Sequence, residues 1–357
     1  MAKLRVAVLF GGVSTEHEIS LISGAAIADN MDADRYEVWK IGITKKGRWL
    51  LYPGPTAGIR DGSWETSPDC VPAFLSPDRT NHGLVLNHGS TFDVLKLDMV
   101  FPALHGKYGE DGTVQGLLEM AGIPYVGCGV LASATCMDKA AANLVFAQHG
   151  IAHTPWLAVH RTQMADEAAM LRRVTDAMAF PVFVKPAAAG SSIGVTKVKT
   201  PEELRAAMLL ASAHHHTVLV EEAVVGQEVE CAVLGNETPV CTLPGEIISC
   251  NEVYDYEAKY ESGDASRLLL PANLPVEKLE EVRAVALKAY AALGCSGLSR
   301  IDFFVREGTG EVLISEINTM PGFTPISMYP KLMEKDGLPF PKLVDRLVQL
   351  AQERAEG

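Results

Sequence analysis

Two carboxylates, an amide and a guanidinium recur at alternating positions toward the C-terminal end of the chain. Arg300 and Asp302 alternate with the apolar residues of one predicted strand, and Glu316 and Asn318 do the same in the next. Residues 307–310 contain two glycines and predict the turn between the strands. Side chains two positions apart share one face of a strand, and a hairpin brings two such faces together. We therefore expect these four side chains on one surface.

That surface has the composition of a site for a hard divalent cation. Two carboxylates that face each other across a sheet repel, and burial increases the cost. Asp302, Glu316 and the amide oxygen of Asn318 supply the oxygen ligands that Mg²⁺ prefers, and this cation also binds waters and phosphate oxygens. A solvated strand face with an Arg300–Asp302 ion pair is the alternative.

A lysine followed by a loop rich in glycine and serine marks a second candidate site. Lys185 lies in the predicted strand 180–186, and residues 187–194 read AAAGSSIG. The backbone N–H groups and hydroxyls of such a loop can bind phosphate. The spacing is not that of a P-loop, and a flexible hairpin is the alternative.

Two further candidates follow predicted buried strands in the N-terminal third. Strand 4–10 ends at two glycines and leads to Glu16, and strand 97–104 leads to His105 in a glycine-punctuated loop. Open α/β sheets bind ligands at this edge, although the glycine pair does not match the GxGxxG pattern of dinucleotide sites. Glu16 can instead act as a favourable charge at a helix N-terminus, and His105 can instead be a structural histidine.

Two segments of the C-terminal half suit a nucleotide. The predicted strands 217–222 and 228–234 flank a short apolar linker, where backbone groups would bind adenine and a carboxylate would bind a ribose hydroxyl. Residues 251–270 are polar and aromatic without periodicity, which predicts a lid loop. A structural surface loop is the alternative.

The composition excludes several classes of protein. The chain has 357 residues and a formal net charge of −13, which argues against a nucleic-acid partner. Its seven cysteines are odd in number and include no CxxC pair, which favours a reducing cytoplasm over a disulfide framework or zinc site. We find no signal-peptide leader and no apolar run of about 18 residues, so we expect a cytoplasmic protein without a membrane segment. Residues 53–92, rich in Gly, Pro, Ser and Asp, predict a long excursion with little regular structure.

Six segments, spread in order over nearly the whole chain, form a specific set of motifs. They are GGVSTEHEIS at 11–20, HGKYGEDGTVQG at 105–116, GCGVLASATCMDK at 127–139, VKPAAAGSSIGV at 184–195, DYEAKY at 255–260, and RIDFF with EINTMPGFT across 300–324. Together they resemble the D-alanine–D-alanine ligase family of the ATP-grasp superfamily.

The resemblance implies an α/β protein in which an ATP-grasp fold follows an N-terminal doubly wound parallel-sheet domain. We expect residues 1–135 to form the N-terminal substrate-binding domain and residues 136–225 the central ATP-grasp subdomain. Residues 226–357 would form the C-terminal subdomain, with the metal site and the lid loop 251–270.

The resemblance also implies a role for each candidate residue. Glu16 would bind the ammonium of a first D-alanine, with Ser191 and Tyr260 linked to it, and Arg300 with the Gly322 N–H would form an oxyanion hole. The implied ATP-binding residues are Lys139, Lys185 and Lys259 at the phosphates, Ser192 in the glycine-rich loop, Glu221 and the backbone of Ala223 at adenine, and Glu228 at the ribose. The implied ligands of two Mg²⁺ (or Mn²⁺) ions are Asp302, Glu316 and Asn318, and the implied substrate-pocket residues are His105, Ser327 and Met328.

The implied activity is the ATP-dependent joining of two D-alanines through an acyl phosphate, which supplies a peptidoglycan precursor, by a homodimer. Tyr260, where depsipeptide-forming relatives carry histidine, favours an amine nucleophile. Met328, where D-serine-forming relatives carry arginine, favours D-alanine, with a D-alanine–D-serine ligase of the vancomycin-resistance type as the alternative. A catalytically silent nucleotide-binding regulator is a further alternative, against which the intact metal-ligand set argues.

Overall fold

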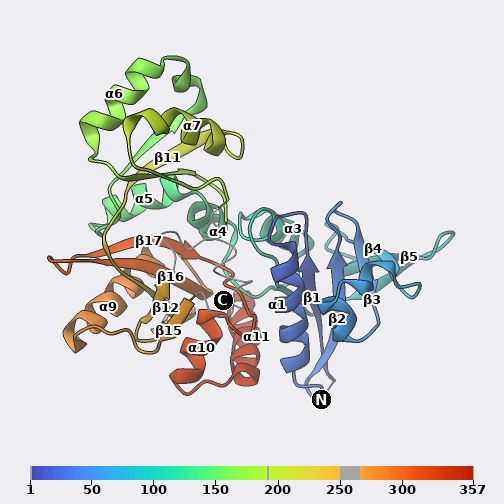
Figure 1. Cartoon of the computed structure of the whole chain (residues 1–357). Coiled ribbons are helices and arrows are strands. Elements are labelled where there is room, and N and C mark those ends of the chain that lie inside the picture. Colours follow the sequence, from blue (N-terminus) through green and yellow to red (C-terminus); the bar gives the residue numbers. More distant parts are fainter. Residues whose placement is uncertain (1, 191–192, 250–265, 357) are drawn as a thin grey trace.

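The computed structural model describes residues 2–190, 193–249 and 266–356. Three sheets, each with its own helices, make up these residues, and they are arranged around a central region where the green, blue and orange parts of the chain meet (Figure 1). The N-terminal sheet lies on one side, the sheet of the central segment stands above, and the C-terminal sheet lies opposite the first.

The N-terminal sheet has seven strands in the order β6-β5-β4-β3-β2-β1-β7. β1 pairs in parallel with both β2 and β7, and the other neighbours are antiparallel. The strands are β1 (Leu4–Gly11), β2 (Tyr36–Ile43), β3 (Trp49–Tyr52), β4 (Val71–Leu75), β5 (Gly83–Asn87), β6 (Phe92–Lys96) and β7 (Met99–Pro102), and the helices are α1 (His17–Asn30), α2 (Thr56–Arg60), the 3-10 helix Ser63–Thr66 and α3 (Thr113–Ala121). The predicted turn after β1 is confirmed. It requires glycine, because Gly11 has a φ of +86° and a Cβ there would lie 2.2 Å from the Ile43 carbonyl oxygen.

Residues 53–92 are folded, so the prediction of an excursion with little regular structure is wrong. They supply α2, a 3-10 helix, β4, β5 and the first residue of β6, and the antiparallel strands extend the sheet beyond β3. Trp64 anchors the segment: it is buried, and its ring meets Phe10 edge-on with 5.0 Å between ring centroids. Strands of five residues separated by polar turns carry too little alternation to stand out in the sequence.

The central segment forms a four-stranded antiparallel sheet in the order β10-β9-β11-β8. Its strands are β8 (Trp156–His160), β9 (Val182–Pro186), β10 (Thr196–Val198) and β11 (Thr217–Glu222), and the helices before and on it are α4 (Val130–Met137), α5 (Lys139–Gln148), the 3-10 helix Arg161–Ala165, α6 (Glu167–Ala177) and α7 (Pro201–Ser212). Its core is separate from the others and is built from residues such as Val174, Val184 and Val218.

The C-terminal sheet runs in the order β15-β14-β12-β16-β17, with β13 paired to β12. Its strands are β12 (Gly226–Gly235), β13 (Val240–Cys241), β14 (Gly245–Ser249), β15 (Ser266–Leu269), β16 (Gly297–Arg306) and β17 (Val312–Asn318), and its helices are α9 (Val276–Ala292), α10 (Met328–Lys335) and α11 (Phe340–Glu356). The last helix, α11, packs beside α1, and one hydrophobic core joins Val6 and Phe101 of the N-terminal sheet to Leu343 and Leu347 (Figure 1). The N- and C-terminal sheets are thus held together by buried apolar contacts.

No single helix in the described ranges is long and apolar enough to cross a membrane. Only α4 and α5 taken together reach that length and composition, and they are bent by 103° at the break between them.

Candidate active site

The predicted β-hairpin forms and presents the four predicted polar side chains. β16 and β17 pair antiparallel, with Asp302 opposite Glu316 and Arg300 opposite Asn318. The register shifts between Asp302 and Phe303, so that β17 has one extra residue there. Such a bulge re-aims neighbouring side chains. Ile301 and Phe303 point to the other face and are fully buried, which fixes the polar residues on the face toward the central segment.

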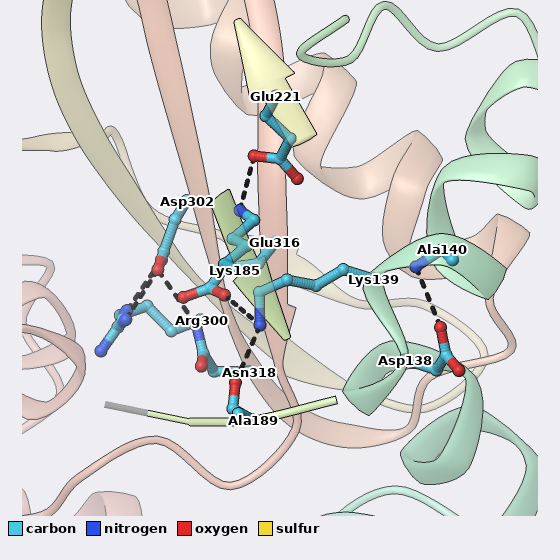
Figure 2. Close-up of polar contacts among 10 residues, drawn as sticks. All are labelled: Asp138, Lys139, Ala140, Lys185, Ala189, Glu221, Arg300, Asp302, Glu316 and Asn318. Atoms are coloured by element: carbon cyan, nitrogen blue, oxygen red, sulfur yellow. Dashed lines mark hydrogen bonds and ion pairs between the residues drawn. The ribbon is translucent and has the colours of Figure 1, made fainter. Parts of the chain in front are cut away.

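A hydrogen-bonded cluster centres on Asp302 (Figure 2). The Arg300 guanidinium donates to both of its carboxylate oxygens, at 2.8 and 2.7 Å, and the Asn318 amide donates to Oδ2 at 3.0 Å. The predicted Arg300–Asp302 ion pair is therefore present, but Asp302 is buried rather than solvated. The Arg300 guanidinium compensates the charge of this buried carboxylate.

Lys139 reaches the same cluster from the first turn of α5. The helix begins there because the Asp138 carboxylate accepts hydrogen bonds from the backbone N–H groups of Ala140 and Ala141, at 3.0 and 3.1 Å. The Lys139 ammonium lies 2.9 Å from Glu316 Oε2 and donates to the Ala189 carbonyl at 3.2 Å (Figure 2). Burial is the largest influence on the pKa of Lys139 and lowers it, but the charge and hydrogen bond of Glu316, together with the charge of Glu221, raise the pKa above its usual value.

A second lysine pairs with a second carboxylate on the central sheet, close to the Lys139–Glu316 pair (Figure 2). Lys185 on β9 lies 2.5 Å from Glu221 on β11, its neighbour in the sheet, and both side chains are largely buried (Figure 2). The backbone N–H of Ala223 donates to the Pro181 carbonyl at 3.3 Å, and Glu228 follows on β12. These four residues lie outside the lining of the cavity described next.

One cavity unites most of the predicted site residues that the structure describes, from distant parts of the chain. Its lining combines Glu16 and the 105–110 loop of the N-terminal sheet with Lys139 and with the hairpin face. The predicted residues that line it are Glu16, His105, Lys139, Arg300, Glu316, Asn318, Gly322, Ser327 and Met328. Asp302 lies behind them, in contact with Arg300 and Asn318. Ser191, Ser192, Lys259 and Tyr260 fall outside the described residues.

Glu16 lies where two glycine loops close on it. It occupies the N-cap position of α1 without making a side-chain capping hydrogen bond, and it is buried. A Cβ added to Gly106 would lie 2.3 Å from Glu16 Oε2, and one added to Gly190 would lie 2.5 Å from the same atom. Both loops therefore need glycine for this close approach. Glu16 therefore lies both at the N-terminus of α1 and in the cavity lining, and its ligand-binding role stays a prediction.

His105 is held by the protein at both ring nitrogens. Nδ1 lies 3.0 Å from the Met320 carbonyl oxygen, which can only accept, so Nδ1 carries the proton. Nε2 lies 3.0 Å from the Ser23 hydroxyl, which also accepts the Phe323 N–H at 3.1 Å. Burial lowers the pKa of His105 and favours the neutral ring. Although His105 lines the cavity, the structural alternative describes its contacts well.

Sequence reasoning missed three polar residues of this region, of which Ser23 and Glu230 are buried. Ser23 links α1 to His105, and Glu110 accepts hydrogen bonds from the backbone N–H groups of Gly106 and Met320, at 2.8 and 3.1 Å. Burial and, second, the nearby Glu16 charge raise the pKa of Glu110 to about 8. Glu230 lies 3.0 Å from Arg300 Nε. A carboxylate two positions from Glu228 in an otherwise apolar strand was the available signal for Glu230.

Comparison with known protein families finds a match for both the N-terminal and the C-terminal part of the chain. Residues 5–128 match the family described as D-ala D-ala ligase N-terminus, and residues 145–349 match the one described as D-ala D-ala ligase C-terminus. A D-alanine–D-alanine ligase of Caldicellulosiruptor bescii is 49% identical over 356 residues, covering 99% of this chain and 96% of that protein.

Two solved structures are similar along their whole length. The VanG D-Ala:D-Ser ligase of Enterococcus faecalis has a TM-score of 0.89 and 40% identity, covering 98% of this chain and 100% of that one. The D-alanine–D-alanine ligase of Coxiella burnetii has a TM-score of 0.85 and 34% identity, covering 99% and 96%. The predicted α/β ATP-grasp fold with its N-terminal domain is thereby confirmed, and the chain belongs to the D-alanine–D-alanine ligase family.

Proposed function

We propose that this protein uses ATP to join two D-alanines into D-alanyl-D-alanine, a peptidoglycan precursor. The observation that carries the proposal is the shared cavity, which Glu16 lines together with Lys139 of α5 and with Arg300, Glu316 and Asn318 of the hairpin. A carboxylate can bind the ammonium group of a first amino acid, and cations can bind the phosphates of a nucleotide. The cavity combines both kinds of group. Full-length similarity to proteins named D-alanine–D-alanine ligase supports the same activity.

The nucleotide would lie between the central and C-terminal sheets. Lys139 and Lys185, now paired with Glu316 and Glu221, would turn to the phosphates, as Lys259 and Ser192 would from their loops. Glu221 and the Ala223 backbone would bind adenine, with Glu228 at the ribose. Because the Ala223 N–H already donates to Pro181, its carbonyl is the group that remains for adenine.

Asp302, Glu316 and Asn318 would hold two Mg²⁺ ions, or Mn²⁺. The donor set fits: two carboxylates and an amide converge on one face, and each carboxylate has a cationic partner in the ligand-free protein. The described residues contain no group of three His, Cys, Asp or Glu able to hold a metal by themselves, so phosphate oxygens and waters would complete the coordination. Bound there, the metal supplies charge neutralisation for phosphoryl transfer.

The reaction needs two displacements. First, a carboxylate oxygen of D-alanine bonds to the γ-phosphorus as the bond to ADP breaks, giving an acyl phosphate. Then the amine of the second D-alanine bonds to the acyl carbon and inorganic phosphate leaves. Glu16 would hold the first ammonium, together with Ser191 and Tyr260, and Arg300 with the Gly322 N–H would stabilise the developing oxyanion, a contribution of about 3 kcal/mol per donor. The predicted lid loop 251–270 is wrong at its C-terminal end, because residues 266–269 form β15 of the C-terminal sheet. Residues 251–265, which lie outside the described residues, would close over the site and exclude water.

D-Alanine is the preferred second substrate. Ser327 and Met328 line the cavity at the start of α10, and Met328 is buried and apolar. The Ser327 hydroxyl accepts a hydrogen bond from the Thr324 N–H at 3.0 Å and shares another with the Thr324 hydroxyl at 2.7 Å. Ser327 is therefore hydrogen-bonded within the protein. D-Serine is the second candidate because of the similarity to VanG. The pocket can discriminate between the methyl group of D-alanine and the hydroxymethyl group of D-serine by only about 1–3 kcal/mol.

The test is a product assay with the purified protein. ATP, Mg²⁺ and D-alanine are expected to release phosphate and give the dipeptide by mass spectrometry, with none from L-alanine. Mixtures of D-alanine with D-serine or D-lactate rank the second substrates by product mass. Asp302→Asn is expected to lower turnover by about 10²-fold or more with the fold retained by circular dichroism. Turnover equal to wild type in that variant would reject the metal assignment. The same preparations, examined by light scattering, test the proposed homodimer.

A further inference from the structure

Glu230 is a buried carboxylate beside the guanidinium that the proposed mechanism uses. It lies on β12, directly opposite Asp302 on β16. Its side chain is 4% exposed, and Oε2 lies 3.0 Å from Arg300 Nε. It also belongs to the cavity lining. Arg300 therefore lies between two carboxylates from neighbouring strands, Asp302 and Glu230.

The two carboxylates hold Arg300 in different ways. Asp302 accepts hydrogen bonds from both Nε–H and a terminal N–H, at 2.8 and 2.7 Å. Glu230 Oε2 forms an ion pair with Nε at 3.0 Å, while the one hydrogen on Nε is directed at Asp302. Asp302 has a second task, because it is a proposed metal ligand. When its oxygens turn to a cation, both of its hydrogen bonds to Arg300 are lost or weakened. Glu230 has no such competing partner among the proposed ligands.

We propose that Glu230 is a positioning residue for Arg300. When Asp302 turns to the metal, the Nε–H that it accepts is transferred to Glu230 Oε2, 3.0 Å away, and the terminal N–H groups stay directed at the reacting carbonyl. A carboxylate is needed rather than an amide, because a largely buried guanidinium that loses the charge of Asp302 must keep another counter-charge. This inference rests on the proposed function, since Arg300 acts as an oxyanion donor only in that reaction.

The chain offers a matched control for Glu230. Glu246 is a buried carboxylate on β14, the strand on the other side of β12, and it accepts hydrogen bonds from Gln227 Nε2 at 3.0 Å and the Asn273 N–H at 2.9 Å. It does not line the cavity. Glu230→Gln and Glu246→Gln each replace one buried carboxylate of the same sheet by its isosteric amide. Only the first removes one of the two carboxylates that pair with Arg300.

Steady-state kinetics and inhibitor binding form the first test. Glu230→Gln is expected to lower kcat about 10- to 100-fold, with KM for ATP within twofold of wild type. Affinity for a phosphinate dipeptide analogue of the tetrahedral intermediate is expected to fall by a similar factor, and affinity for ADP to stay unchanged. Glu246→Gln should match wild type in all of these. A raised KM for ATP with unchanged kcat, or equal effects in both variants, would overturn the proposal.

A double-mutant cycle tests whether Glu230 acts through Arg300. Arg300→Lys keeps the positive charge but loses the planar fork. Adding Glu230→Gln to Arg300→Lys is expected to lower kcat less than threefold further, because the two changes remove one interaction. Effects that multiply would reject the inference.

The ¹⁵N–¹H signal of Arg300 Nε provides a readout without turnover, and it is identified by its loss in Arg300→Lys. In wild type it should stay protected from solvent exchange when Mg²⁺ and a non-hydrolysable ATP analogue are added. In Glu230→Gln it should lose protection on that addition. Protection retained in Glu230→Gln would overturn the proposal. Failure of wild type to form dipeptide would instead reject the proposed function.

Discussion

Lys139 Nζ lies 2.9 Å from Glu316 Oε2, so a proposed phosphate-binding cation and a proposed metal ligand neutralise each other. The pair joins the first turn of α5 to β17 of the C-terminal sheet. The two side chains are 12% and 23% exposed. When a nucleotide binds with its metal, a phosphate would take the place of Glu316 beside Lys139, and the metal ion would take the place of Lys139 beside Glu316. The charges of both side chains would then still be compensated.

Glu316→Gln is expected to destabilise the ligand-free protein by about 1–3 kcal/mol, because it leaves the Lys139 ammonium with less counter-charge. Lys139→Met added to that variant should recover part of the loss, since the uncompensated cation is then gone. Urea unfolding measures both. The control is Glu281→Gln, which breaks the more exposed pair with Lys278 on α9 and should cost less than about 1 kcal/mol. Equal costs at the two sites would contradict the assigned role of the buried pair.

The hairpin could be predicted from the sequence because its signal is local. Alternation places Arg300 and Asp302 on one face, and the short turn sets the pairing with Glu316 and Asn318, as the structure confirms. The Lys139–Glu316 and Arg300–Glu230 pairs could not be predicted this way, because each joins elements far apart in the chain.

The same limit explains the other misses. Ser23 looks like an ordinary residue in the middle of a helix, and only the path of the 105–110 loop and the 320–323 segment gives it two partners. The strands within 53–92 are stabilised by their place at the edge of an existing sheet rather than by a strong pattern of their own.

Gly190→Ala tests whether the glycine-rich loop shapes the binding site for the first substrate. Its Cβ would lie 2.5 Å from Glu16 Oε2, so either the carboxylate or the loop must move. Because misplacement by about 1 Å can cost about 10²-fold in rate, we expect KM for D-alanine to rise about tenfold or more. Gly116→Ala in α3 is the control. Nothing lies within 4 Å of its Cβ, and alanine should leave kinetics unchanged while stabilising the helix by up to about 1 kcal/mol. An unchanged KM in Gly190→Ala would show that Glu16 does not depend on this approach.

Trp64→Ala tests whether the 53–92 segment is an integral part of the N-terminal sheet. The ring is buried, packs on Phe10 and fills the space beside Gly42, where a Cβ would lie 2.1 Å from it. We expect a loss of about 3–5 kcal/mol in the free energy of unfolding, in line with other buried aromatic truncations. Phe92→Ala in β6, at a ring that is 61% exposed, should change it by less than about 0.5 kcal/mol. Similar values for the two variants would mean that the segment adds little to the fold.

Glu110 predicts a stability that falls with rising pH. Burial and the Glu16 charge raise its pKa from 4.5 to about 8, so between these values the folded protein keeps a proton that the unfolded chain releases. The free energy of unfolding therefore decreases across this window, by up to about 1.4 kcal/mol per pH unit for one proton, and the contribution is level above pH 8. Urea unfolding between pH 5 and 9 measures the slope.

Two variants separate the causes of this slope. Glu110→Gln should flatten it, because no proton is then exchanged at that position, even though an amide cannot accept both backbone N–H groups and lowers stability at every pH. Glu16→Gln should move the upper end of the window to lower pH, because the charge of Glu16 is one of the causes that raise the pKa of Glu110. If Glu110→Gln keeps the wild-type slope, the proton belongs to another group. If Glu16→Gln leaves the window in place, burial alone sets the pKa of Glu110.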